Sequence, residues 1–325
     1  RKVKLYISKH IAINDYSGVI SSYPSLSTHW VSYSLSEKYG LFWIADFRDP
    51  INYEANSNKL INNFNKYFQN KIIKQANYTI TISEDLIAKL NLNNKHDNNK
   101  LICIPNGFDP DDYKDVTNLQ KENITKKLKM CYVGSLYGGK RDLSIIFKTM
   151  RNLIDEEIIE EENLIFNYAG NEFDVLNEQA KRFNLSSILV NKGFITREES
   201  IKMQSDSDLI IIVTWNTEID KGIMTGKFYE CLLTNKMILG VVNGTVPNSE
   251  IKRVVNDIKG GFVYEEAALD LLKESESLKN FILEKYLEKQ TNYKIFSTFN
   301  SKIENYNYSN LTNSFIDLLN KNSFN

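Results

Sequence analysis

The sequence predicts an α/β protein with two doubly wound parallel sheets. Short apolar runs alternate with segments of helical periodicity along its 325 residues. Glycine, proline, serine and asparagine cluster at the ends of those runs, where turns are expected. The alternation restarts after a polar stretch, which is typical of a second domain of the same kind. Parallel strands joined by helices need right-handed crossovers, so we expect helices on both faces of each sheet.

The polar stretch at 109–127 divides the chain into two predicted domains. Residues 1–120 form a Rossmann-like first domain, joined by a C-terminal helix at 300–325. Residues 121–299 form a Rossmann-like second domain. The two domains are expected to share an architecture but not a sequence repeat.

The first domain has four predicted strands. Residues 1–14 are expected to be the end of a helix or an edge segment. A helix at 27–39 carries apolar residues at helical spacing, and Gly40 ends it because glycine adopts the left-handed C′ conformation readily. The strands are predicted at 16–22, 41–45, 78–82 and 101–105, and further helices at 58–75 and 84–90.

The second domain has six predicted strands, each followed by a helix. Asp208–Trp215 is apolar throughout, as expected for a parallel strand buried on both faces. Thr196 and Glu199 have capping-box spacing and predict a helix start. The strands are predicted at 130–133, 164–169, 188–194, 208–215, 237–242 and 261–264, and the helices at 140–154, 172–183, 196–205, 227–234, 249–258 and 265–288.

Bulk composition excludes several classes of protein. A net charge of −1 with 25% charged residues is typical neither of a nucleic-acid binder nor of an acidic tail, so no nucleic-acid partner is expected. No stretch approaches the roughly 20 apolar residues of a spanning helix. Cys103, Cys131 and Cys231 are far apart in apolar segments, which predicts core residues in a reducing, cytoplasmic compartment. No metal-ligand spacing is present, so no metal and no cofactor are predicted.

Residues at three strand ends of the second domain predict an anion site. Ligands of such sheets lie outside the carboxyl ends of the strands, where helix N-terminal amides point outward. These amides, a hydroxyl and cations there would clamp a diphosphate. Lys140 and Arg141 are expected at a helix start, where a solvated cation pair is unfavourable against the helix dipole and an anion would explain it. The residues are Gly134 and Ser135, Gly193 and Phe194, Thr225, Gly226 and Glu230, with Lys140 and Arg141.

Six short motifs resemble one enzyme family. No G-x-G-x-x-G or Walker motif occurs, which argues against a dehydrogenase or a Walker-type NTPase. The chain is similar instead to the GT-B glycosyltransferases of family four, which are retaining, metal-independent enzymes that use nucleotide sugars. The matches run in family order over nearly the whole chain. They are ADFRDP (45–50), ANYTITIS (76–83), IPNGFD (104–109), YVGSLYGGKRD (132–142), NYAG (167–170) and TGKFYECL (225–232).

The resemblance implies roles for individual residues. Glu230 matches the glutamate that binds the ribose hydroxyls, and Lys140 matches the lysine on the donor diphosphate. The amides of Thr225 and Gly226 would touch phosphate, and backbone near Phe194 would meet the base. The candidate donor-site residues are therefore Gly134, Ser135, Lys140, Arg141, Phe194, Thr225, Gly226, Lys227 and Glu230.

The chain departs from the family pattern near the donor sugar. Gly222 stands where the family has the first of two glutamates, and Glu218 or Asp220 would replace that contact. Ser135 stands where an arginine is frequent, for which Arg141 would compensate.

The first domain departs from the pattern as well. Arg48 replaces a histidine near the sugar. Arg48 and Asp49 are the candidate catalytic residues, with an ion pair that fixes a turn as the alternative. His29 is expected either to touch substrate or to be structural. The family's glycine-rich loop does not precede the strand at Val19, so the first domain is expected to be incomplete.

These observations predict a bacterial glycosyltransferase. It would move a sugar from a nucleoside diphosphate sugar to a saccharide or lipid-linked acceptor, with retention and without a metal, in cell-surface polysaccharide synthesis. The alternatives are a nucleotide-binding module or fragment impaired in catalysis, and a sugar-nucleotide epimerase of the same fold. An epimerase needs histidine and carboxylate groups in its cleft, and the second half of the chain has no histidine.

A basic helix at 58–75 offers a peripheral contact to the inner face of the cell membrane. The alternative is a helix that faces the core, with its lysines in solvent. Its interleaved basic and apolar residues are Lys59, Leu60, Phe64, Lys66, Phe68, Lys71, Ile72 and Lys74.

Overall fold

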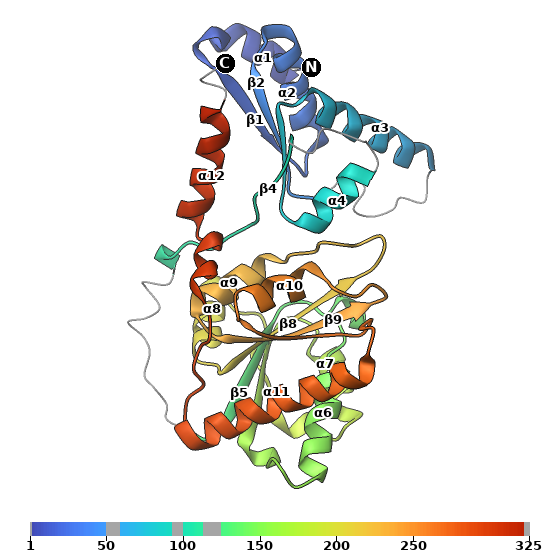
Figure 1. Ribbon diagram of the computed structural model, residues 1–325, viewed down its shortest axis with the longest axis vertical. Coiled ribbons are helices and arrows are strands. Elements are labelled where there is room, and N and C mark those ends of the chain that lie inside the picture. The colour runs from blue at the N-terminus through green and yellow to red at the C-terminus, as the bar shows by residue number, and fades with distance from the viewer. Residues whose placement is uncertain (1, 50–58, 93–99, 113–124, 322–325) are drawn as a thin grey trace. The chain divides into compact units, whose positions relative to one another are not determined.

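The computed structural model describes residues 2–49, 59–92, 100–112 and 125–321 (Figure 1). Two compact units divide the chain. Unit 1 comprises residues 1–106, 219–222 and 310–325, and unit 2 comprises residues 107–218 and 223–309. Each unit contains one parallel sheet, of four strands in unit 1 and six in unit 2. The predicted α/β class with two doubly wound parallel sheets is confirmed.

The sheet of unit 1 has the strand order β1-β2-β3-β4. Its strands are β1 (Gly18–Ser22), β2 (Phe42–Phe47), β3 (Tyr78–Thr81) and β4 (Leu101–Cys103). Its helices are α1 (Lys2–His10), α2 (Leu26–Tyr39), α3 (Lys59–Gln75), α4 (Glu84–Leu92) and α12 (Tyr308–Asn320). Gly40 follows α2 with a φ of 67°, which confirms the predicted helix end. The first segment of the chain is a helix, one of the two alternatives expected.

Strand β2 is buried on both faces because alternate side chains enter two cores. Trp43 and Phe47 pack with residues of α2 and α3 on one face, including Ile72. Ile44 packs on the other face with Leu311 of α12. The C-terminal helix therefore closes one face of the unit 1 sheet.

The sheet of unit 2 has the order β10-β9-β8-β5-β6-β7. Its strands are β5 (Leu128–Val133), β6 (Leu164–Ala169), β7 (Leu189–Asn191), β8 (Leu209–Asn216), β9 (Met237–Gly244) and β10 (Gly261–Glu265). Its helices are α6 (Ser144–Asp155), α7 (Phe173–Lys181), α8 (Arg197–Ser205), α9 (Gly226–Thr234), α10 (Glu250–Asp257) and α11 (Leu271–Asn292). The strand order reverses between β5 and β8, the position where ligands bind in sheets of this topology.

Two hydrophobic clusters cover the two faces of this sheet. One contains alternate residues of β5 and β8 with side chains of α6, α7 and α11, among them Ile211 and Phe147. The other contains the intervening strand residues with side chains of α9 and α10, among them Ile212 and Phe228. Figure 1 shows α6 and α11 on one side of the sheet and α9 and α10 on the other. The site at the strand ends thus rests on a sheet packed from both sides.

Several predicted element boundaries in unit 2 are wrong. The helix predicted from Lys140 begins only at Ser144, because a 3₁₀ turn at Tyr137–Gly139 comes first. The last helix begins at Leu271, where Asp270 caps it by accepting a hydrogen bond from the amide of Lys273. Strand β7 ends at Asn191, short of the predicted 194. Residues 113–124 of the predicted interdomain stretch lie outside the described residues.

Helix α8 begins as predicted. The amide of Glu199 donates to the Thr196 side chain, and the Thr196 amide donates to the Glu199 carboxylate at 2.8 Å. This capping box fixes the position of Arg197, the first residue of α8, because it satisfies the helix's free N–H groups reciprocally.

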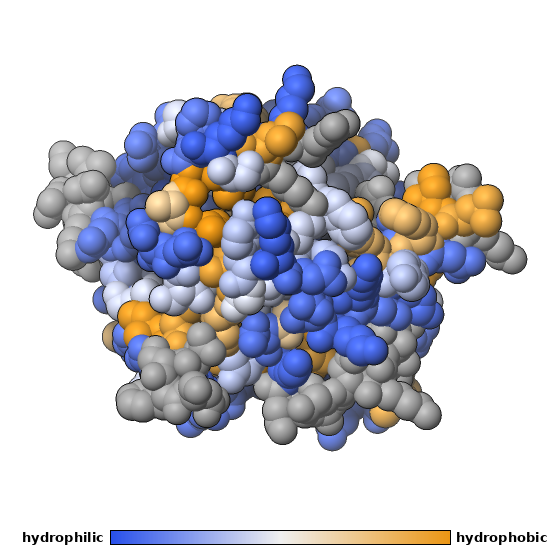
Figure 2. Space-filling model, turned by 90° about the horizontal axis from the view of Figure 1, so that it is seen from above, coloured by the Kyte–Doolittle hydropathy of each residue, from blue (hydrophilic) through white to orange (hydrophobic). Residues whose placement is uncertain are grey.

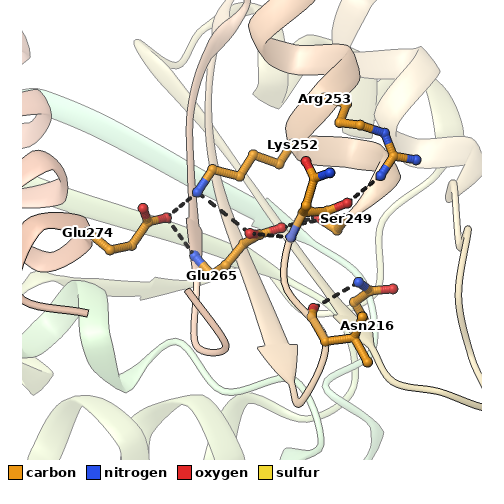
Figure 3. Close-up of polar contacts among 8 residues, drawn as sticks. Asn216, Ser249, Lys252, Arg253, Glu265 and Glu274 are labelled. Carbon is orange, nitrogen blue, oxygen red and sulfur yellow. Dashed lines mark hydrogen bonds and ion pairs between the residues drawn. The ribbon is translucent and has the colours of Figure 1, made fainter. Parts of the chain in front are cut away.

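A polar network holds the loops after β8 and β9 (Figure 3). The buried carboxylate of Glu265 accepts hydrogen bonds from the amide and hydroxyl of Ser249, both at 2.6 Å, and so fixes the residue before α10. Lys252 contacts Glu265 and Glu274, so that its charge balances theirs. The Asn216 amide group donates to the carbonyl of Val246 at 2.9 Å. The carboxyl ends of these strands therefore carry ordered loops.

Within the described part of the chain, no helix is both long enough and apolar enough to cross a membrane.

Candidate functional site

A pocket lies at the reversal point between β5 and β8 in unit 2. It is lined by the carboxyl end of β5, by β8 and by residues at the start of α9. Its lining residues are Tyr132, Val133, Arg141, Gln204, Ile210, Ile211, Ile212, Val213, Thr225, Lys227 and Cys231. Three of the predicted site residues, Arg141, Thr225 and Lys227, are therefore brought together here.

Gly134 allows Lys227 to reach the end of β5. Its φ is 140°, in a region of backbone conformation that residues other than glycine rarely adopt. A Cβ added at this position would lie 2.1 Å from the Lys227 ammonium nitrogen. Without that Cβ, the ammonium group donates a hydrogen bond to the Val133 carbonyl at 2.9 Å. The glycine is thus needed for the close approach of a cation.

Arg141 is buried and aimed by the loop that follows β5. Its Nη1 donates to the Ser135 carbonyl at 3.0 Å and to the Tyr132 hydroxyl at 3.3 Å. Its guanidinium carbon lies 4.7 Å from the ring centre of Tyr137 and 5.4 Å from that of Trp215. These contacts leave the Arg141 Nε buried and without an acceptor among the described residues.

Arg141 and Lys227 form a pair of cations in one pocket. Burial of the ammonium group lowers the pKa of Lys227, and the positive charge of Arg141 lowers it further. Lys227 as a residue is exposed, so the burial that lowers this pKa is that of its terminal ammonium group. Neither cation pairs with a carboxylate across the ranges that the structure describes. Two like charges that repel each other in a pocket are the arrangement that an anion would stabilise.

The start of α9 adds hydrogen-bond donors beside this cation pair. Helix α9 begins at Gly226, and the side chain of its N-cap residue Thr225 makes no capping hydrogen bond. The first N–H groups of a helix have no intrahelical acceptor and carry part of the positive end of its dipole. Thr225 and Gly226 therefore lie at the start of this helix, and Thr225 lines the pocket, while their contact with phosphate stays a prediction.

Glu230 lies on α9 and contacts Arg197 of α8. The Arg197 Nε lies 3.4 Å from the Glu230 carboxylate, and its Nη2 lies 2.7 Å from that of Asp112. These partners raise the pKa of Arg197, with the hydrogen bond to Asp112 as the main cause. Sequence reasoning missed Arg197, although the capping box that places it was visible. Phe194, between β7 and α8, has a side chain that is 93% exposed.

The glycine loop after β5 differs from the prediction. The amides of Leu136, Tyr137 and Gly138 donate to the carboxylate of Glu172, at 2.6, 3.1 and 2.7 Å. The Ser135 hydroxyl donates to the same carboxylate. Ser135 and these amides are therefore occupied by a side chain of the protein. Sequence reasoning missed Glu172, whose only signal was its place at a predicted helix start.

Lys140 and Arg141 do not begin a helix, so the expectation based on an unfavourable helix dipole is wrong for them. The Lys140 ammonium group lies 3.8 Å from the ring centre of Trp215. The Arg141 guanidinium also lies near the Trp215 ring, so Trp215 contacts both Lys140 and Arg141.

Arg48 lies at the carboxyl end of β2 in unit 1. Its Nε pairs with Asp46 at 3.0 Å and its Nη1 donates to the Asn106 side-chain carbonyl at 2.8 Å. The ion pair of the alternative interpretation thus forms with Asp46 in place of Asp49. The second carboxylate oxygen of Asp46 is buried without a partner among the described residues. Burial raises the pKa of Asp49.

His29 is fully buried behind this strand end. Its Nδ1 lies 2.7 Å from the Ser21 hydroxyl, which also accepts a hydrogen bond from the Trp43 indole. Burial lowers the pKa of His29 to about 4. The buried position fits the structural alternative for this histidine.

Gly222 has a packing role in unit 1. Its φ is 74°, and a Cβ there would lie 2.4 Å from the Ser83 hydroxyl oxygen. That hydroxyl donates to the Gly222 carbonyl at 3.0 Å. A glutamate at this position would collide with the start of α4.

The described residues also contain no group of three or more His, Cys, Asp or Glu side chains that could hold a metal ion.

Comparison with known proteins identifies the fold. No protein-family model and no curated protein sequence matches the chain. The structure resembles a sucrose-phosphate synthase from Thermosynechococcus elongatus, with a TM-score of 0.64 and 12% identity over 98% of this chain and 76% of that one. It also resembles Anabaena HepE in complex with UDP, with a TM-score of 0.63 and 11% identity over 98% and 81% of the two chains.

A third neighbour is the lipopolysaccharide outer core galactosyltransferase WaaB, with a TM-score of 0.61 and 9% identity over 99% of this chain and 78% of that one. At these identities the likeness establishes the fold. The chain has the GT-B fold of these glycosyltransferases, and the predicted fold is confirmed.

Proposed function

We propose that the chain is a glycosyltransferase that takes a sugar from a nucleoside diphosphate sugar. The observation that carries this proposal is the pair of cations, Arg141 and Lys227, in the pocket at the strand-order reversal. HepE, which shares the fold, has been crystallised with UDP, with UDP and glucose, and with UDP-glucose. The same fold with two cations free to meet an anion supports a diphosphate ligand.

Each donor-site residue has a role in this proposal. Lys227, Arg141 and the first amides of α9 neutralise the diphosphate as it departs, and the cations supply the stabilisation that a metal supplies elsewhere. Lys140 adds a further positive charge at the rim. Glu230, oriented by Arg197, binds the ribose hydroxyls. Backbone near Phe194 meets the base. Transfer with retention and without a metal is part of the proposal.

The acceptor is proposed to be a saccharide or a lipid-linked saccharide that binds unit 1. Arg48 and Asp49 lie at the carboxyl end of β2, beside the buried and half-satisfied carboxylate of Asp46. A sugar hydroxyl would contact the partly exposed side chains of Arg48 and Asp49, which Asp46 holds at this strand end. WaaB, which shares the fold, acts on the lipopolysaccharide outer core. That likeness supports a role in bacterial surface-polysaccharide synthesis.

Helix α3 supports a peripheral contact with the cytoplasmic face of a membrane. Its second half packs into the core through Ile72 and its neighbours, as the core-facing alternative expected. Its first half exposes Leu60, Phe64 and Tyr67 by 78%, 60% and 65%. Figure 2 shows hydrophobic side chains beside hydrophilic ones on one face of the molecule. Apolar side chains near the lysines of α3 are typical of a helix that lies on an anionic surface.

The competing candidate is a nucleotide-binding module that does not transfer sugar. The loop at Ser135–Gly138 favours this candidate, because its amides already donate hydrogen bonds to Glu172 and are not available to a phosphate. An epimerase of the same fold is disfavoured because the second half of the chain has no histidine, and because His29 in the first half is buried.

Calorimetric titration with UDP and GDP tests the proposal. We expect micromolar binding of at least one of them by the unmodified protein. Lys227→Ala should weaken that binding, whereas Lys181→Ala, which removes a mostly exposed lysine on α7, should leave it unchanged. No binding of any nucleoside diphosphate would refute the donor site. A donor-hydrolysis assay then separates a transferase from a binding module, because only a transferase turns the donor over.

A further inference from the structure

We infer that Glu172 is a positioning residue of the donor site, an inference that rests on the proposed function. Its carboxylate fills the ring of donors formed by the loop after β5, where a phosphate would otherwise bind. The loop is thereby held in the one conformation that aims Arg141 at the pocket. The diphosphate then meets Arg141, Lys227 and the start of α9, and the loop amides do not contact it.

The hydrogen bonds of Glu172 support a permanent role. One carboxylate oxygen accepts from the Ser135 hydroxyl and from the amides of Leu136 and Tyr137, and the other accepts from the Gly138 amide. The Ser135 hydroxyl is the main cause, and the Gly138 amide the next, of a lowered pKa for Glu172, so the carboxylate is charged at neutral pH. A ligand phosphate would have to displace all of these contacts.

The loop conformation that Glu172 stabilises is an unusual one. Tyr137 has a φ of 51°, which a residue with a side chain adopts only at a cost, and Gly138 and Gly139 also have positive φ values. The Leu136 side chain is fully buried, which anchors the loop to the core. A carboxylate that binds three successive amides offsets the cost of this turn.

Glu172 acts on Arg141 through two residues. Arg141 donates to the carbonyl of Ser135 and stacks on the ring of Tyr137. Glu172 binds the hydroxyl of Ser135 and the amide of Tyr137. Both loop residues that contact Arg141 are therefore bound by this one carboxylate, and the Tyr132 hydroxyl adds a hydrogen bond to the Ser135 carbonyl at 2.7 Å.

The position of Glu172 at a helix start is consistent with this role. It is the N-cap residue of α7, yet its side chain makes no capping hydrogen bond to that helix. Its backbone amide donates a hydrogen bond to the Tyr168 hydroxyl at 3.0 Å. The carboxylate is directed to the loop in preference to its own helix.

Hydrogen exchange in the absence of nucleotide tests whether Glu172 holds the loop. In Glu172→Ala, the amides of 136–138 should exchange about tenfold faster or more, because their acceptor is gone. Glu178→Ala removes an exposed carboxylate from the same helix and should leave this exchange unchanged. Unchanged exchange in Glu172→Ala would overturn the inference whether or not any nucleotide binds.

Calorimetry with UDP tests whether the loop positions Arg141. Glu172→Ala should bind UDP about tenfold more weakly than the unmodified protein. Added formate should restore part of that affinity in Glu172→Ala and change nothing in Glu178→Ala, because a small carboxylate refills the ring of donors. Binding that is equal or tighter would overturn the inference, and tighter binding would identify Glu172 as a phosphate mimic that blocks the site.

Glu172→Gln covers the case in which the alanine variant does not fold. The amide side chain keeps the volume of Glu172 and can accept from only part of the donor set. Faster exchange of these amides and weaker UDP binding are expected, both smaller than in the alanine variant. If the unmodified protein binds no nucleoside diphosphate, the proposed function fails and the exchange data still decide whether Glu172 orders the loop.

Discussion

Replacement of Gly134 by alanine should remove Lys227 from the donor pocket. The new Cβ would lie 2.1 Å from the Lys227 ammonium nitrogen, well inside van der Waals contact. The ammonium group lies at the end of a flexible side chain, so it would swing away and lose its hydrogen bond to the Val133 carbonyl at 2.9 Å. The backbone would also be strained, because φ at Gly134 is 140°.

The expected cost has two parts. Alanine in this sparsely populated backbone region costs about 1–3 kcal/mol of stability. Loss of one charge-assisted contact to the diphosphate costs about 1.5–3 kcal/mol of binding, which corresponds to a roughly 10- to 150-fold weaker affinity for UDP. The protein should therefore remain folded while its affinity falls.

Gly40→Ala is the matched control. Gly40, at the end of α2, also has a positive φ, of 67°, but a Cβ there would have nothing within 4 Å. Its backbone strain costs about 1–2 kcal/mol and leaves Lys227 in place. Thermal unfolding and calorimetry with UDP should show both variants destabilised and only Gly134→Ala weakened in binding. Equal UDP affinity in the two variants would refute the assignment of Lys227 to the pocket.

Three further predictions concern ionisable groups. The pKa of Lys227 is lowered in the free protein, and a bound diphosphate would raise it. The affinity for UDP should therefore fall as the pH rises through the pKa of Lys227 in the free protein. Calorimetry should show proton uptake on binding in this pH range, and Lys227→Ala should abolish that uptake. His29 has a folded pKa of about 4 against an ordinary 6.5, so the unfolded chain binds the extra proton. Stability to urea should therefore drop by about 3 kcal/mol between pH 6.5 and 4, and this drop should be absent in His29→Asn. Burial raises the pKa of Cys131 to about 12 and that of Cys231 well above its usual value, so a thiol reagent should label the native protein only at Cys103; labelling of either buried cysteine before unfolding would contradict this.

Local sequence patterns were sufficient for much of the fold. The strand at 164–169 has the predicted bounds, and the helix end at Gly40 and the capping box at Thr196 were predicted from a few residues. These features depend on neighbours within about one turn of a helix or one strand, so the sequence records them directly. The start of α6 was predicted too early because the turn at Tyr137–Gly139 precedes it.

The candidate site depends on contacts between distant residues. Alternating apolar and glycine-containing segments determined by themselves that parallel sheets form and that polar residues gather at their strand ends. Only the tertiary structure placed β5 beside β8, and with them Arg141 beside Lys227. It alone showed that the Glu172 carboxylate binds the amides of the loop and that Arg197 contacts Glu230. The physical reason is that strand order and side-chain pairing across the sheet arise from packing of the whole chain, which local periodicity does not record.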